Sequence, residues 1–197
     1  FSGFAEPFPH LMWPTIAVLL MAGAVVYRNN VLVALSAIAV GYILGGATAY
    51  WHASYALIME EPVISIVAFA ALGAGAFWLR DRLPTSYQQL ATVFWRTCFL
   101  LANFGFWIGS LWGDYVLDGW LASKMNWETF QTFRDTAVFI PDIAFVLTWP
   151  AALLATIAVG TRTQQLFLVN TAIVFLGIHF YTQYFETLQW SPTSVVV

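Results

Sequence analysis

The chain of 197 residues contains very little charge. It has seven basic and ten acidic side chains, so that charged residues make up 9% of it and apolar residues 60%. Soluble domains carry about 25% charged residues. The composition excludes a soluble globular domain, a disordered tail and a basic nucleic-acid binder. It predicts a multi-pass membrane protein whose main partner is the lipid bilayer.

Cysteine and recognisable catalytic motifs are equally scarce. Because Cys98 is the single cysteine, an internal disulfide and a CxxC redox or zinc motif are excluded. The metalloprotease HExxH, the hydrolase GxSxG and the phosphate-binding glycine patterns are also missing from the sequence. The net charge of −3 comes with no run of basic residues for nucleic acid or anionic lipid. The sequence therefore points to no enzyme and to no nucleic-acid partner.

Long apolar runs dominate the rest of the sequence. About 20 apolar residues in a helix cross a bilayer, and long continuous runs favour helices over barrel strands. We therefore expect an all-α, polytopic transmembrane helix bundle that forms a single domain, 1–197. Its six predicted spans are about 11–27, 31–58, 62–79, 90–113, 136–160 and 166–185.

Two features lie outside these spans. The longest join, 114–135, contains Trp120, Trp127 and Phe130 among its charges, and it is expected to lie on the exterior membrane surface as an amphipathic segment. The chain begins with Phe1 and ends in a short valine run. From these ends we expect a fragment of a longer chain.

The basic residues are divided unevenly between the two sides of this predicted bundle. One side has only Lys124 and Arg134. The other side has the remaining five, which are Arg28, Arg80, Arg82, Arg96 and Arg162. Cytoplasmic joins are enriched in Lys and Arg. The pattern therefore predicts that the odd-numbered joins are cytoplasmic and that both visible ends are exterior.

Small residues recur at four-residue spacing in two of the spans. These stripes are Gly105, Gly109 and Gly113 in the fourth span, and Gly41 and Gly45 in the second. Such stripes let helices in lipid approach closely. We expect them to pack helices within the bundle, and a homodimer seam is the alternative. Asn103, in the middle of the fourth span, is expected to donate a hydrogen bond to a neighbouring helix.

Three ionisable side chains are predicted inside the exterior halves of the spans, where a charge is costly. They are His52, Asp142 and His179, each about 10–12 Å from the exterior helix end at 1.5 Å per residue. His179, Gln183 and Glu186 share one helical face, and Tyr55 follows His52 by one turn. These six residues are the candidate ligand- or ion-binding residues.

Three functions fit this polar layer. The first is handling of a small solute or ion through an outward-facing polar pocket. The second is a haem- or pigment-binding subunit of a membrane complex, with His52 and His179 as axial ligands, because imidazole is a usual haem ligand. The third is a structural or assembly subunit without a ligand, in which these residues only hydrogen-bond neighbouring helices. The sequence requires no cofactor.

Parts of the chain also resemble known proteins. The resemblance rests on three stretches: WHASYAL at 51–57, FGFWIGSLWGD at 104–114, and NTA at 170–172 with YTQYFE at 181–186. They are similar to a bacterial group of predicted multi-pass inner-membrane proteins of unknown function. The resemblance implies a bacterial inner membrane and further helices beyond both ends. It implies no activity and no binding residues.

Overall fold

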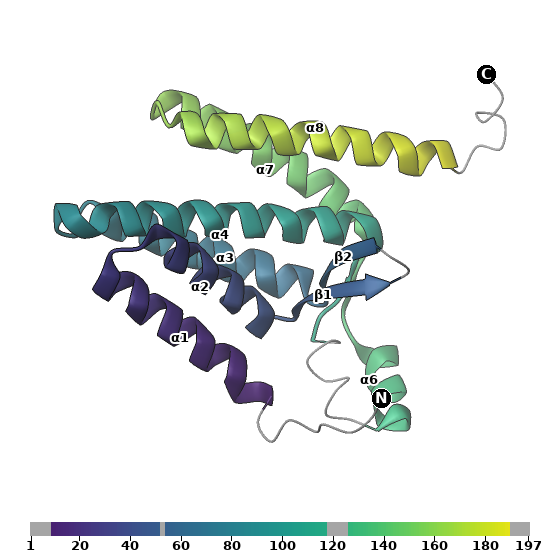
Figure 1. Ribbon diagram of the computed structural model, residues 1–197. Helices are drawn as coiled ribbons and strands as arrows, with labels where there is room; N and C mark the ends of the chain where they lie inside the picture. The colour runs from purple at the N-terminus through teal and green to yellow at the C-terminus, as the bar shows by residue number, and fades with distance from the viewer. Residues whose placement is uncertain (1–8, 52–53, 118–125, 190–197) are drawn as a thin grey trace.

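The computed structural model describes residues 9–51, 54–117 and 126–189, and most of these residues are helical (Figure 1). Seven helices lie in this part of the chain: α1 (Pro9–Tyr27), α2 (Asn30–Ile43), α3 (Pro62–Arg80), α4 (Thr85–Trp112), α6 (Trp127–Thr136), α7 (Asp142–Arg162) and α8 (Leu166–Gln189). Two antiparallel strand pairs join them. The pairs are β1 (Gly46–Trp51) with β2 (Ser54–Met59), and β3 (Asp114–Tyr115) with β4 (Phe139–Ile140).

Four helices are long and apolar enough to cross a membrane, namely α3, α4, α7 and α8. Two further apolar stretches are shorter, namely Leu11–Tyr27 within α1 and Asn30–Ile43, which is α2. Only 17–33% of the residues in the four long spans are buried inside the protein, so most residues of these spans keep part of their surface exposed. Soluble monomers rarely expose apolar patches larger than a few hundred Å². The four helices are consistent with a protein embedded in a membrane.

The prediction of one continuous helix over 31–58 is wrong. Helix α2 ends at Ile43, and Gly45 then adopts a φ of +88°, a left-handed conformation that suits glycine. The remainder of the apolar run forms the β1–β2 hairpin, with Gly46 opposite Met59. Aromatic and β-branched residues in this run favour strands. A run that is apolar throughout has no period to distinguish a helix from a strand.

The predicted fifth span also begins too early. Helix α6 ends at Thr136, and α7 begins only at Asp142, after Pro141 in an extended conformation. Proline disfavours a helical conformation in the residue before it, so Ile140 pairs as a strand with Asp114 instead. The join predicted to be amphipathic does contain the polar helix α6. Its position on a membrane surface stays a prediction.

Helix α4 lies at the centre of the bundle and contacts α1, α2, α3, α7 and α8 (Figure 1). On one side, its Cys98 packs with Phe69 of α3 and Ala37 of α2, all of them fully buried. On the other side, a second cluster joins Trp149 of α7 to Phe175 of α8. The core of the protein is therefore built around α4.

The glycine stripe of α4 packs against other parts of the same chain. A Cβ atom on Gly105 would lie 2.8 Å from Ile66 of α3, and one on Gly109 would lie 2.6 Å from the ring of Phe145 of α7. Gly113 has a φ of +69° and ends α4. On α2, Gly41 faces Phe69 at an ordinary contact distance of 3.5 Å. A homodimer seam on another face stays a prediction.

The α1–α2, α3–α4 and α7–α8 joins lie at the same end of the bundle (Figure 1). These joins carry Arg28, Arg80, Arg82 and Arg162 at or next to the helix ends. The β1–β2 hairpin and α6 lie toward the opposite end. The uneven division of basic residues along the sequence is therefore also a division between the two ends of the structure.

Candidate functional site

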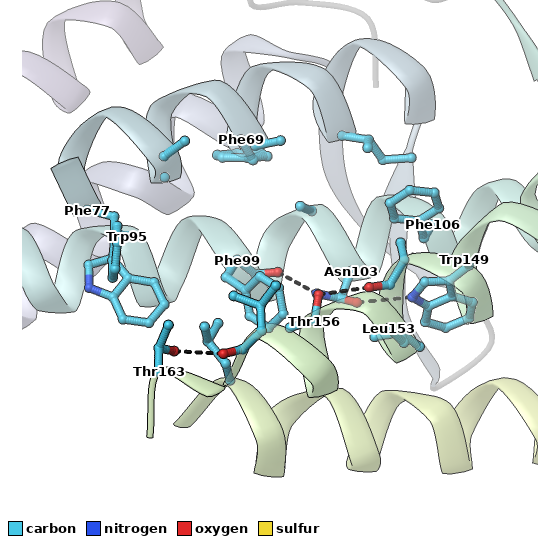
Figure 2. Close-up of a pocket in the computed structure, with 18 residues that line it drawn as sticks. Phe69, Phe77, Trp95, Phe99, Asn103, Phe106, Trp149, Leu153, Thr156 and Thr163 are labelled. Carbon is cyan, nitrogen blue, oxygen red and sulfur yellow. Dashed lines mark hydrogen bonds between the residues drawn. The ribbon is translucent and has the colours of Figure 1, made fainter. Parts of the chain in front are cut away.

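Helices α3, α4 and α7 line a cavity of about 430 Å³ (Figure 2). Its walls are mostly apolar and rich in aromatic rings. They include Phe69 and Phe77 of α3, Trp95, Phe99 and Phe106 of α4, and Trp149 of α7. Small-molecule sites in proteins typically have volumes of about 300–1,000 Å³ and mostly apolar walls with a few polar groups. The cavity has the size and the lining of such a site.

One buried polar pair lies in the cavity wall. The indole Nε1 of Trp149 donates a hydrogen bond to Oδ1 of Asn103 at 3.0 Å, and Nδ2 of Asn103 donates to the carbonyl oxygen of Phe99 at 2.8 Å (Figure 2). Trp149 is fully buried and Asn103 is 4% exposed. Buried polar groups are costly without partners. These two bonds therefore fix the orientation of both side chains, and the bond from Trp149 joins α7 to α4.

The threonines in the wall add little polarity to the cavity. The hydroxyl of Thr156 donates to the carbonyl oxygen of Ala152, and that of Thr163 donates to Val159, both at 2.8 Å. Each bond stays within the threonine's own helical segment, so the hydroxyl hydrogens are not directed at the cavity. The space therefore favours an apolar molecule over a hydrated ion.

Trp95 is the exception among the polar groups of the wall. Its ring is 4% exposed and meets Phe77 and Phe167 edge to face, with centroid distances of 5.5 and 5.3 Å. Its buried Nε1 has no hydrogen-bond acceptor in the described part of the chain.

Among the predicted site residues, His179 has the closest link to the cavity. It is 4% exposed on α8, and its ring contacts Trp149 edge to face with centroids 5.2 Å apart. Trp149 thus contacts Asn103 through its indole nitrogen and His179 through its ring. His179 lies behind the cavity wall and supports the side chain that forms it.

The predicted layer of three polar residues inside three helices is not what the structure shows. Asp142 is exposed at the first residue of α7, so it does not lie two turns inside a helix. His52 lies outside the described residues. Tyr55 pairs with Tyr50 in the hairpin instead of following His52 by one helical turn. The sequence prediction failed because it assumed helices through 31–58 and 136–160.

The other predicted residues lie on α8. Gln183 is half-buried, and Glu186 is exposed at the end of a shallow groove between α4 and α8. In that groove Trp107 donates a hydrogen bond from Nε1 to the hydroxyl of Thr182 at 3.1 Å. This bond, like that of Trp149, joins α4 to a helix of the second core cluster.

Two buried carboxylates were not predicted as special. Glu61 is fully buried, and its Oε2 accepts a hydrogen bond from the backbone N–H of Leu117 at 2.8 Å. Asp114 is 3% exposed, and its Oδ2 accepts from the N–H of Val63 at 2.8 Å. The two bonds fasten the start of α3 to the segment after α4. Sequence reasoning treated both residues as ordinary charges in joins.

Within the described residues, no group of three or more His, Cys, Asp or Glu side chains is placed to hold a metal ion. The predicted haem pair includes His52, which is not described, so axial ligation by His52 and His179 stays a prediction. Comparison with known proteins adds no assignment, because no family model, curated protein or solved structure matches this chain.

Proposed function

We propose that this protein is an integral membrane protein that binds a small, largely apolar molecule from the lipid phase between α3, α4 and α7. The observation that carries the proposal is the cavity of about 430 Å³ with its aromatic wall. A buried aromatic wall binds apolar molecules by excluding solvent and by dispersion contacts. The Asn103–Trp149 pair is the polar part of the wall that would orient such a molecule.

The proposed membrane is the bacterial inner membrane, which the sequence resemblance implies. The proposed orientation places the end with Arg28, Arg80, Arg82 and Arg162 in the cytoplasm, following the preference of cytoplasmic joins for basic residues. Handling of a small solute or ion through an exterior polar pocket stays a prediction. The described residues support the apolar site more directly, because Asp142 is exposed and His179 is buried against Trp149.

The experiment compares two neighbouring alanines of α7. Ala152 lines the cavity and Ala151 does not, yet both are exposed on the same helix. In Ala152→Trp the indole fills the cavity, while Ala151→Trp adds the same ring outside it. The probe is the apolar fluorophore 1-aminoanthracene, titrated into protein in lipid nanodiscs.

The wild type and Ala151→Trp should give a saturable rise in fluorescence above that of empty nanodiscs. Ala152→Trp should bind at least about tenfold more weakly, which corresponds to about 1.4 kcal/mol. Equal, non-saturable partitioning in all three proteins would contradict the proposal. That result would favour the structural subunit without a ligand.

A further inference from the structure

A second apolar groove, of about 820 Å³, lies between the α1–α2 pair and the α3–α4 pair. It shares no lining residue with the cavity described above. The groove is lined by Val25, Leu72, Leu79, Tyr87, Leu90 and Phe94, among others. It continues to Leu83 and Pro84 in the α3–α4 join. The groove therefore runs along the helices to the end of the bundle that carries the arginines.

Two arginines lie beside the end of this groove. Cζ of Arg28, in the α1–α2 join, lies 5.7 Å from the ring centroid of Tyr87, which lines the groove. Arg82 directly precedes the lining residue Leu83, and its Cζ lies 3.4 Å from the ring centroid of Trp78. Helices α2 and α3 separate these two arginines in the sequence, so no run of basic residues indicates that they lie close together. The fold brings both of them to one groove.

Both guanidinium groups are exposed, and neither forms an ion pair with a carboxylate in the part of the chain that the structure describes. Arg80 differs from them, because its Nε lies 2.8 Å from Oδ1 of Asp81. The groove thus combines a long apolar surface with two unneutralised positive charges at one end. A molecule with an apolar chain and an anionic head matches this combination.

We infer that the groove binds an anionic phospholipid, with an acyl chain along α3 and α4 and the phosphate beside Arg28 and Arg82. This inference depends on the proposed membrane location but not on the proposed ligand of the α3–α4–α7 cavity. Basic pockets between membrane helices hold anionic headgroups by charge attraction, and arginine matches phosphate geometry with paired hydrogen bonds. A neutral or zwitterionic lipid would leave the two charges uncompensated.

The test measures lipid selectivity by electron spin resonance of the full chain in vesicles. The probes are phosphatidylglycerol and phosphatidylcholine, each with a spin label near the end of one acyl chain. The test variant is Arg28→Gln/Arg82→Gln. The control, Arg134→Gln/Arg162→Gln, removes the same charge at positions away from the groove. A third variant, Ala71→Trp, places a large ring on a residue that lines the groove.

The wild type and the control should restrict phosphatidylglycerol more than phosphatidylcholine. Each groove arginine should increase the relative affinity for phosphatidylglycerol by about fivefold. Arg28→Gln/Arg82→Gln should lose the preference. Ala71→Trp should lower binding of both lipids. Equal restriction of the two lipids in the wild type would overturn the inference, as would equal losses in the test and control variants.

A change of oligomeric state in Ala71→Trp without a change in bound lipid would also overturn the inference, because it would identify a second copy as the occupant. A complete lack of restricted lipid in every protein would instead mean that the chain is not embedded, so that the proposed membrane location fails. These outcomes separate failure of the groove from failure of the proposed function.

Discussion

Replacing Gly109 with alanine should weaken the contact between α4 and α7. The new Cβ atom would lie 2.6 Å from Cδ1 and Cε1 of Phe145 and 2.9 Å from its Cγ. Ordinary contacts between carbon atoms are about 3.5–4.0 Å long, so the ring would have to move by about 1 Å. Phe145 is only 4% exposed and has little room to move. Overpacking of this kind typically costs about 1–3 kcal/mol.

The matched control is Gly75→Ala on α3, where an added Cβ has no atom within 4 Å. Both substitutions reduce the conformational freedom of the unfolded chain by the same amount, which stabilises the folded helix by up to about 1 kcal/mol. The difference between the two variants therefore isolates the clash with Phe145. We expect Gly109→Ala to be less stable than Gly75→Ala by about 1–3 kcal/mol.

The assay is reversible unfolding of the protein in mixed micelles of a mild detergent and dodecyl sulfate. Gly177→Ala, on α8, is a second control because its Cβ also has open space. If Gly109→Ala proves as stable as both controls, the close packing of α4 against α7 is refuted. The account of the glycine stripe would then be wrong.

Three further predictions follow from the polar contacts. Asn103→Leu removes the acceptor of the Trp149 indole and should lower the free energy of unfolding by about 1–3 kcal/mol in the same assay. In the double variant Asn103→Leu/Trp149→Phe, the loss should be smaller than the sum of the two single losses, because both substitutions remove the same bond. Strictly additive losses would contradict the pairing. Asp114→Ala should speed hydrogen exchange at the amide of Val63, whereas Asp114→Asn, which keeps an acceptor, should largely preserve its protection. Equal exchange rates in the two variants would contradict the hydrogen bond from Val63 to Asp114. The hydrogen bond from Arg80 lowers the pKa of the Asp81 carboxyl. The stabilising effect of the pair is therefore present at neutral pH and is lost as the pH falls through that lowered pKa. Arg80→Gln should raise the pKa of Asp81 in a titration followed by nuclear magnetic resonance.

The sequence predicts most of the helical elements because their limits have local causes. Helix α3 begins at Pro62, which suits the first turn of a helix, and it ends at Arg80, where polar residues follow. The predicted range 166–185 starts where α8 starts. Such limits depend on proline geometry and on the loss of apolar character, which are properties of neighbouring residues.

The errors in the predicted elements have equally local causes. After Ile43 the sequence stays apolar, so composition alone does not reveal that Gly45 and Gly46 end the helix. At Pro141 the apolar pattern continues as well, although the residue before a proline resists the helical conformation. In both places the apolar run continues past the residue at which the backbone preference limits the helix.

The candidate site could be predicted only in part. Asn103 was expected to bond to a neighbouring helix, and the bond with Trp149 confirms the contact. The expected direction was wrong, because Asn103 accepts from α7 and donates to its own helix. The cavity itself requires three helices to be placed side by side, and the partner of Asn103 is 46 residues away. One sequence contains no signal for a pairing at that distance.

The measurement that tests the membrane account most directly is the accessibility of single cysteines in a Cys98→Ser background. Asp81 and Thr163 are exposed at the end with the arginines, and Val138 is exposed between α6 and α7. Each is replaced by cysteine and treated with a membrane-impermeant maleimide in right-side-out and inverted vesicles. The account predicts that positions 81 and 163 react only in inverted vesicles and that position 138 reacts only in right-side-out vesicles. Reaction of all three positions from the same side would contradict it.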